Sequence, residues 1–164
     1  MPDGGGGLAI WSRYPLHPEH NYPGFELGVL RAVVDAPSGP VTLYAVHLLP
    51  PYPYPSGEWI RELARLRALL DATGGSRPVV VGGDFNATVD QAPFRRLLGH
   101  GYRDAAEQLG AGYLATYPTD HPPLPPVIAI DHLLLRDASP VSLRTVALPK
   151  SDHRGLLVRV ALDA

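Results

Sequence analysis

The sequence PVVVGGDFNA occupies residues 78–87. The three valines after Pro78 predict a short buried strand, and the two glycines that follow predict a tight turn. That turn presents Asp84 and Asn86 on alternate positions, so a carboxylate and a carboxamide stand at the carboxyl end of a buried strand, where functional sites are often built. Gly-Asp and Asn-Ala pairs also occur in ordinary turns, so these residues alone leave a purely structural interpretation open.

Other parts of the chain place polar side chains at the ends of apolar runs in the same way. They are Ala45-Val46-His47, Ile130-Asp131-His132 and Ser151-Asp152-His153. A histidine among the aliphatic residues of a strand is more often a hydrogen-bonded core residue than a catalyst, and this interpretation of His47 stays open. Asp131 is different, because a buried carboxylate is costly unless it is paired or bound to a cation. We therefore predict a partner for Asp131.

Length and composition indicate one compact domain. A chain of 164 residues can bury about 70% of its unfolded surface. Its 45% hydrophobic and 18% charged residues are typical of a globular protein, and its 19 prolines and 17 glycines indicate many rigid or sharply turned connections. The chain has no cysteine, which excludes disulfides, thiolate metal sites and a cysteine nucleophile. Histidine, carboxylate and amide side chains must therefore carry any chemistry.

The charge and the apolar runs limit the class of partner. The net charge is −2, and the basic residues, almost all arginine, are scattered along the chain. They do not form the basic surface that nonspecific duplex binding needs, so DNA is not the favoured substrate. No run reaches the about 18 apolar residues of a membrane span, and residues 1–4 lack the features of a signal peptide. We expect a soluble chain, and the sequence does not distinguish a bacterial cytoplasmic from an extracytoplasmic location.

The apolar periodicity predicts an α/β order of elements. After a flexible glycine run at residues 4–7, strands are expected at 8–13, 26–35 and 41–48, with a loop at 16–25 and a hairpin connection at 36–40. Apolar residues at helical spacing predict a helix over 56–73, which leads into the strand at 79–81 as an α/β crossover. A short helix at 90–98, a helical turn at 102–106, and strands at 127–135, 141–148 and 155–162 complete the order.

Four ordered motifs of this chain resemble those of the endonuclease/exonuclease/phosphatase superfamily: His47, Gly83-Asp84-Phe85-Asn86, Ile130-Asp131-His132 and Ser151-Asp152-His153. The stretch LAIWSRYPL at residues 8–16 is also similar to an inner strand of that family, of the form G-x-A-I-x-S-R-Y-P. The resemblance covers essentially the whole chain. It implies a DNase I-like fold, which is a four-layer α/β/β/α sandwich of mixed sheets, with residues 1–164 as a single domain.

The resemblance also implies a Mg²⁺- or Mn²⁺-dependent hydrolase of phosphoric esters. Both are hard cations that take carboxylate and carboxamide oxygens. Asp152 matches the metal-binding aspartate of the family. Asp84 and Asn86 match the residues that position or deprotonate the attacking water, hold the phosphoryl oxygens and contribute to a second metal position.

Two histidines receive roles from the same resemblance. His153 matches the histidine that contacts the scissile phosphate, and Asp131 matches the carboxylate that orients this ring and favours its cation. His47 matches a second histidine, which is a phosphate ligand or a proton donor to the leaving group. His132 is expected to be structural, because its side chain should point to the opposite face of the strand from Asp131.

The chain departs from the family pattern at its beginning. In the family, an asparagine on the first strand and a metal-binding glutamate in a motif of the form L-Q-E precede the strand that matches residues 8–13. Neither is in this sequence, and Glu19, Glu26 and Glu58 lie in contexts that do not replace that glutamate. We therefore expect the C-terminal two-thirds of a truncated or split domain, with an N-terminal half as its missing partner. Such a chain should bind Mg²⁺ weakly and expose a strand edge and apolar surface.

The sequence supports three functional hypotheses. The favoured one is a divalent-metal-dependent phosphoesterase that acts on a phosphomono- or phosphodiester, with a small or lipid-linked substrate. The second is an endonuclease or exonuclease acting on nucleic acid, which the absence of a basic stripe disfavours. The third is a catalytically inactive fragment that serves as an interaction module, and the missing glutamate supports it.

Overall fold

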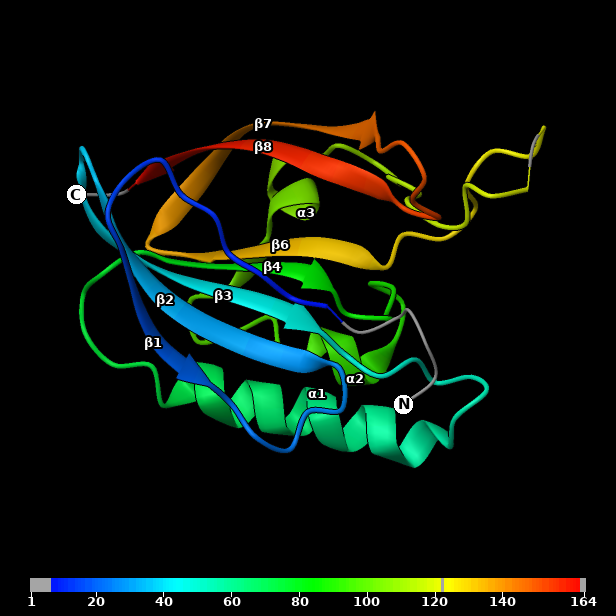
Figure 1. Cartoon of the computed structure of the whole chain (residues 1–164), viewed down its shortest axis with the longest axis horizontal. Coiled ribbons are helices and arrows are strands. Elements are labelled where there is room, and N and C mark those ends of the chain that lie inside the picture. The colour runs from blue at the N-terminus through cyan, green and yellow to red at the C-terminus, as the bar shows by residue number, and fades with distance from the viewer. Residues whose placement is uncertain (1–6, 122, 163–164) are drawn as a thin grey trace.

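The computed structural model describes residues 7–121 and 123–162 (Figure 1). Its strands are β1 Leu16–Asn21, β2 Gly28–Ala36, β3 Gly39–His47, β4 Val79–Asp84, β5 Arg103–Asp104, β6 Asp131–Arg136, β7 Ala138–Ala147 and β8 Arg154–Leu162, and its helices are α1 Ser56–Asp71, α2 Ala92–Arg95 and α3 Ala105–Leu109. Six strands form the main sheet in the order β1-β2-β3-β4-β6-β5, and β7 pairs with β8. None of the helices in the described ranges is long and apolar enough to span a bilayer. The result is the mixed-sheet α/β architecture that the sequence predicts.

The strand directions at the centre of the main sheet bring polar residues to one edge. β3 and β4 pair in parallel, with α1 as the connection between them, whereas β4 and β6 are antiparallel. The carboxyl ends of β3 and β4 therefore meet the amino end of β6. The register pairs His47 with Asp84 and Asp84 with Asp131. Three residues that are far apart in the sequence thus become neighbours through strand pairing.

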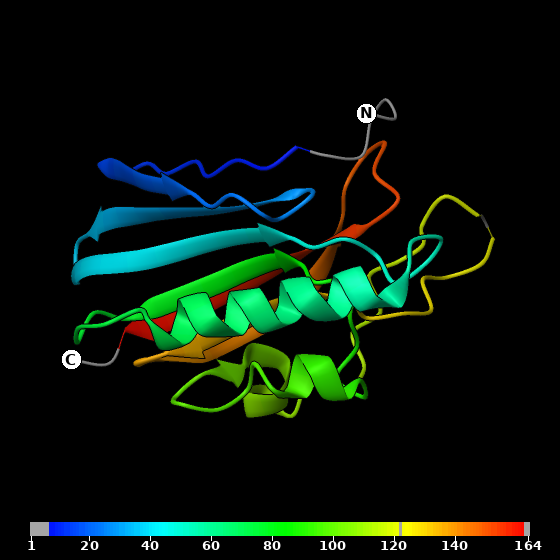
Figure 2. The same ribbon diagram turned by 90° about the horizontal axis from the view of Figure 1, so that it is seen from below.

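Helix α1 covers one face of the main sheet and forms the larger core with it (Figure 2). Its buried apolar residues are Trp59, Leu63, Leu66 and Leu70, and the sheet contributes Val46, Val79 and Val81. Burying each of these side chains contributes roughly 1.5–3 kcal/mol. The Trp59 indole also donates a hydrogen bond to the carbonyl of Phe85 at 3.3 Å. Helix α1 therefore supports the turn that follows β4.

The β7–β8 ribbon covers part of the opposite face of the main sheet. Leu135 and Ala138 are buried there, and Val80, Leu133, Leu143, Val158, Val160 and Leu162 pack around them. In the described part of the chain, β8 has β7 as its strand neighbour and no other. The ribbon is therefore attached to the main sheet by the short chain connection at Asp137 and by side-chain packing, and not by a continuous ladder of hydrogen bonds.

The prediction of a strand at residues 8–13 and of a loop at 16–25 is wrong. Residues 8–13 are irregular, whereas Leu16–Asn21 forms β1 at the edge of the main sheet. A strand needs a hydrogen-bonded neighbour, and among the described residues 8–13 pair with none. Residues 16–21, in contrast, pair with β2. Pro18 is tolerated there because an edge strand leaves the hydrogen-bonding groups of one side unpaired. Of the predicted glycine run at residues 4–7, all but Gly7 lies outside the described residues.

Smaller differences concern the ends of elements. The helix predicted over 90–98 is reduced to α2, and the helical turn predicted over 102–106 is β5 followed by α3. The strand predicted over 127–135 begins only at Asp131, since the proline-rich segment before it stays outside the sheet. The predicted strands at 141–148 and 155–162 are confirmed as β7 and β8 with slightly different ends.

Candidate functional site

His47, Asp84 and Asp131 stand side by side where β3 and β4 end and β6 begins. The Nε2 atom of His47 lies 3.6 Å from Oδ2 of Asp84. All three side chains are at least partly buried, so water screens their interactions only in part. The sheet register thus places one imidazole and two carboxylates at a single edge of the molecule.

His153 joins these residues from the turn that precedes β8. Its Nδ1 atom lies 2.8 Å from Oδ2 of Asp131, and its Nε2 atom lies 3.9 Å from Oδ2 of Asp84. The hydrogen bond to Asp131 raises the pKa of His153, and the negative charges of Asp131, Asp84 and Asp152 add to this effect against the opposing effect of burial. The ring of Tyr117 lies 4.7 Å from the His153 ring, a contact that no feature of the sequence indicated. Asp131 therefore has the partner that the sequence predicted.

Asp84 and Asn86 are held together by the turn after β4. The backbone N–H of Asn86 donates to Oδ1 of Asp84 at 2.7 Å, and its side-chain amide donates to Oδ2 of Asp84 at 3.2 Å and to the carbonyl of Leu48 at 2.8 Å. Asn86 adopts a positive φ of 47°, which asparagine tolerates better than most residues. Burial raises the pKa of Asp84 to about 6, partly opposed by the hydrogen bond from Asn86. We refer to His47, Asp84, Asn86, Asp131 and His153 as the edge cluster.

The two histidines of the edge cluster have pKa values shifted in opposite directions. Burial lowers the pKa of His47, and the nearby positive charge of His153 lowers it further. The Asp131 hydrogen bond raises the pKa of His153. Protonation is therefore favoured at His153 over His47, which is the kind of division that acid–base chemistry requires.

Asp152 immediately precedes His153 in the chain and is exposed. The backbone carbonyl of Asp152 accepts a hydrogen bond from Thr119 at 2.9 Å. Within residues 7–121 and 123–162, no three His, Cys, Asp or Glu side chains are grouped so that they could hold a metal ion. Mg²⁺ is commonly bound by one or two carboxylates, and water and substrate phosphate complete its shell. The oxygen donors of Asp84, Asn86 and Asp152 fit such a site in their chemistry.

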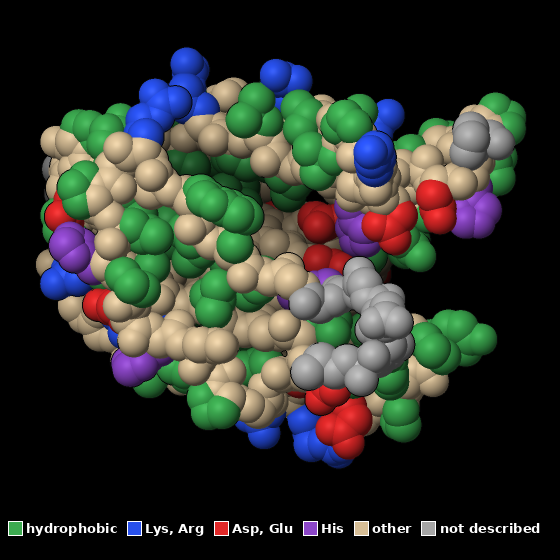
Figure 3. All heavy atoms as spheres, in the orientation of Figure 1, with side chains coloured by type: hydrophobic (Ala, Val, Ile, Leu, Met, Phe, Trp, Pro, Cys, Tyr) green, Lys and Arg blue, Asp and Glu red, His purple; other side chains and the backbone are tan. Residues whose placement is uncertain are grey.

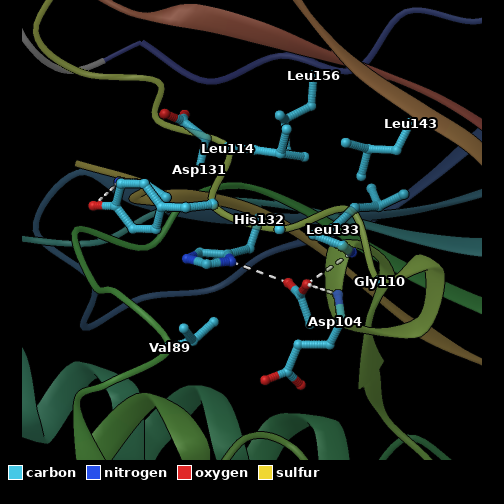
Figure 4. Close-up of a pocket in the computed structure, with 14 residues that line it drawn as sticks. Val89, Asp104, Gly110, Leu114, Asp131, His132, Leu133, Leu143 and Leu156 are labelled. Atoms are coloured by element: carbon cyan, nitrogen blue, oxygen red, sulfur yellow. Dashed lines mark hydrogen bonds and ion pairs between the residues drawn. The ribbon is translucent and has the colours of Figure 1, made fainter. Parts of the chain in front are cut away.

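His132 lies on the other face of β6 and has a structural role. It is buried, and its Nδ1 atom lies 3.0 Å from Asp104 (Figure 4). Its Nε2 atom donates to the carbonyl of Ala87 at 2.8 Å. The Asp104 carboxylate also accepts hydrogen bonds from the backbone N–H groups of Ala106 and Glu107, which caps α3. This link ties α3 to the residue that follows Asn86. Sequence analysis did not identify Asp104, although an aspartate just before a helical turn is a common cap.

An apolar cavity of about 320 Å³ adjoins the edge cluster, with Asp131 in its wall. The other wall residues include Leu114, Leu133, Leu143 and Leu156, which come from a loop and three strands (Figure 4). Figure 3 shows a hollow with hydrophobic walls on this face of the molecule, and acidic and histidine side chains gather near its right-hand end. The polar cluster is therefore flanked by apolar surface.

Replacing Asp131 with asparagine should lower the pKa of His153. The substitution replaces the carboxylate whose hydrogen bond with Nδ1, at 2.8 Å, is the largest cause of the raised pKa, and it also removes that carboxylate's negative charge. A raised folded-state pKa stabilises the protein below the unfolded-state pKa, and this stability is lost as pH rises through the folded-state value; Asp131→Asn should reduce it. NMR titration of the His153 ring in the metal-free protein measures the shift.

The matched control for this titration is Asp35→Asn, which removes a carboxylate 2.8 Å from Nε2 of the exposed His17. That change should leave the titration of His153 where it is in the unaltered chain. An unchanged His153 titration in Asp131→Asn would show that the pair does not set the charge of this ring.

Comparisons with known proteins agree with the fold and the motifs. The sequence model described as Endonuclease/Exonuclease/phosphatase family matches residues 1–153. The structure of TDP2 from D. rerio, complexed with a single strand DNA product, superimposes with a TM-score of 0.71 at 19% identity, covering 89% of this chain and 68% of that one. An endonuclease/exonuclease/phosphatase from Beutenbergia cavernae gives 0.63 at 24% identity, covering 93% and 46%.

A functionally unknown conserved protein from Enterococcus faecalis is also similar in structure, with a TM-score of 0.68 at 16% identity, and the match covers 87% of this chain and 60% of that one. None of the curated proteins matches the chain. Across these three solved structures the chain spans 46–68% of the length of its neighbour. Identities this low carry the fold and not the substrate.

Proposed function

The chain belongs to the endonuclease/exonuclease/phosphatase family, and from this membership we propose that it is a divalent-metal-dependent phosphoesterase acting on phosphomono- or phosphodiesters. One observation carries the proposal: the strand register aligns His47, Asp84 and Asp131, and His153 is 2.8 Å from Asp131. Members of this family are hydrolases, and the edge cluster contains the acid, base and amide groups that ester hydrolysis needs. We favour a small or lipid-linked substrate.

We assign Asp84 to the attacking water. Its pKa of about 6 lies just below neutral pH, so the carboxylate is mostly ionised there and still basic enough to accept a proton. The hydrogen bond from the Asn86 backbone fixes one carboxylate oxygen at 2.7 Å. This leaves the carboxylate oriented before substrate arrives, and pre-organisation of this kind lowers the cost of reaching the transition state.

We assign different roles to the two histidines. His153, held by Asp131 and favoured as a cation, donates a hydrogen bond to a phosphoryl oxygen and stabilises the negative charge that develops there. His47, whose pKa is lowered, is neutral near pH 7, and its N–H binds the phosphate or hydrogen-bonds the leaving oxygen. Both Nε2 atoms lie within 4 Å of Oδ2 of Asp84, so they face one small space.

Asp152, Asp84 and Asn86 are the residues that we assign to Mg²⁺ or Mn²⁺. When bound, such a cation neutralises charge on the phosphoryl oxygens and lowers the pKa of attached water. The small number of protein ligands and the exposed position of Asp152 support a weak affinity for the cation. The substrate phosphate would complete its coordination shell.

Two other functions compete with this one. A nuclease is the second candidate, because the TDP2 neighbour was crystallised with a single strand DNA product. A catalytically inactive interaction module is the third candidate. We propose residues 1–164 as a single domain of the family.

Hydrolysis of bis-p-nitrophenyl phosphate by the purified chain tests the proposal. We expect p-nitrophenol release with Mg²⁺ or Mn²⁺, a fall to the buffer rate with excess chelator, and recovery when the metal is restored, because the assigned ligands lie within the reacting cluster. Release that persists in chelator would refute the metal assignment. No release from a chain shown to be folded would favour the inactive fragment.

A further inference from the structure

Two loops project from the molecule at the end that carries the edge cluster (Figures 1 and 2). The Tyr52 loop, residues 48–55, follows His47 and leads into α1. The Leu124 loop, residues 117–128, precedes Asp131 in the chain and is described except for residue 122. The two loops therefore leave the main sheet beside the proposed catalytic groups, one before α1 and one before β6.

Large apolar side chains are unusually exposed on these two loops. Tyr52 is 85% exposed and Leu124 is 68% exposed, and Val127 and Tyr54 are also open to solvent. Figure 3 shows hydrophobic side chains on both projections at the right of the view. Single exposed apolar residues are normal on a soluble protein, but their concentration on two loops around a site marks an interaction surface.

Both loops are fixed in place rather than free. The Leu124 loop is closed by a hydrogen bond from Val127 N–H to the Tyr117 carbonyl at 2.9 Å, and Thr119 bonds to the backbone of Asp152 and Ser151 at 2.9 and 2.7 Å. The Tyr52 loop is anchored where the Leu49 N–H donates to the buried Glu62 of α1 at 2.7 Å. Prolines at several positions of both loops fix φ. Little conformational freedom is therefore left to lose on binding.

The charges around the loops indicate what kind of surface they meet. There is no Lys or Arg in residues 48–60 and none in residues 104–131, although acidic residues occur in both. The two loops therefore supply no cations of their own to compensate nucleic-acid phosphates or the headgroups of anionic lipids. Tyrosine with leucine and valine is instead the composition found where protein meets the interface of a bilayer.

We propose that the Tyr52 and Leu124 loops insert into the interface of a zwitterionic phospholipid bilayer and hold the edge cluster over the headgroups. The proposal rests on the phosphoesterase function proposed above, and it names the substrate class of that site as the headgroup phosphoester of a phospholipid. In the reaction, water attacks phosphorus, the P–O bond to the leaving alcohol breaks, and the proton from water passes to the leaving oxygen by way of the edge cluster. Contact is by loop tips, so the protein binds reversibly on one leaflet.

Co-sedimentation of the metal-free protein with phosphatidylcholine vesicles tests the docking step without any reaction. The test variant is the double change Tyr52→Ser and Leu124→Ser. The matched control is Val141→Ser with Leu157→Ser, which removes two exposed apolar side chains from the β7–β8 ribbon. We expect the partition coefficient to fall at least about tenfold in the loop variant and to stay within about twofold in the control. Binding should not weaken between low and high NaCl.

Three results would overturn the inference: no binding of the unaltered chain to the vesicles, equal binding by the loop variant with a normal thermal unfolding curve, or tighter binding to a labelled oligothymidine than to vesicles. Hydrolysis of soluble bis-p-nitrophenyl phosphate separates this result from the fate of the proposed function. Vesicle binding without any hydrolysis would leave the docking surface standing and remove the catalytic proposal. Hydrolysis without vesicle binding would support the catalytic proposal and refute the docking surface.

Discussion

Replacing His153 with alanine is expected to reduce kcat/KM for bis-p-nitrophenyl phosphate by at least about 100-fold, the usual contribution of a positioned acid or base. The imidazole is the group that both reaches the space beside Asp84, with Nε2 at 3.9 Å from Oδ2, and bonds to Asp131 at 2.8 Å. Its loss removes the favoured cation of the edge cluster and leaves Asp131 without its partner. Initial rates at saturating metal measure the effect.

The control for this change is His17→Ala. His17 also pairs with a carboxylate at 2.8 Å, that of Asp35, but it lies in the edge strand β1 and is largely exposed. Its replacement should leave the rate unchanged. Equal rates for the unaltered chain and His153→Ala, with both folded, would mean that any observed hydrolysis does not come from the edge cluster.

Replacing Gly83 with alanine is expected to destabilise the fold strongly, although it adds only one methyl group. A Cβ at this position would lie 1.9 Å from the carbonyl oxygen of Val46 in the neighbouring strand β3, and the backbone φ of Gly83 is +146°. The oxygen belongs to the backbone of the central parallel pair and cannot move without breaking the ladder. We expect a loss of about 3 kcal/mol or more in the free energy of unfolding, which corresponds to a fall in Tm of roughly 6–12 °C.

Gly82→Ala is the matched comparison for Gly83→Ala. The added Cβ at position 82 meets the tip of the flexible Leu133 side chain at 2.9 Å, and the backbone conformation is one that alanine adopts. We expect it to cost less than about 1.5 kcal/mol. Thermal unfolding followed by circular dichroism distinguishes the two. Equal stabilities would show that β3 and β4 can separate at this point at little cost.

The core elements could be predicted from the sequence because their patterns are strong. The valines of β4, the helical spacing of Trp59, Leu63, Leu66 and Leu70, and the alternation in β8 each satisfy a local rule. β1 could not be found this way, since Leu16–Asn21 is polar and contains Pro18. The segment becomes a strand because it forms hydrogen bonds with the edge of β2. The local sequence of a segment does not indicate whether such a neighbouring strand is available.

The candidate site could be predicted as a set of residues but not as a geometry. Motif order named the members of the edge cluster, and their roles stay proposals. The alignment of His47 with Asp84 and Asp131 depends on strand register, which only the folded sheet reveals. The support that Asp104 gives through His132 was missed because it joins residues 28 positions apart on opposite sides of a loop.

The attachment of the β7–β8 ribbon affects the fraction of time for which His153 lies beside the rest of the edge cluster. His153 immediately precedes β8, whereas His47, Asp84 and Asp131 belong to the main sheet, and in the described residues no hydrogen-bonded strand ladder joins the two sheets. The turn before β8 is held by a few bonds, among them the Arg154 N–H to the Thr116 carbonyl at 2.8 Å and His153 to Asp131 at 2.8 Å. A unit with so few bonds opens with a smaller free energy than the whole molecule. We expect a brief opening of this turn to withdraw His153 while the other three stay in register. The fraction of time for which the site is assembled should then be set by this local equilibrium and decline on warming before the main sheet melts.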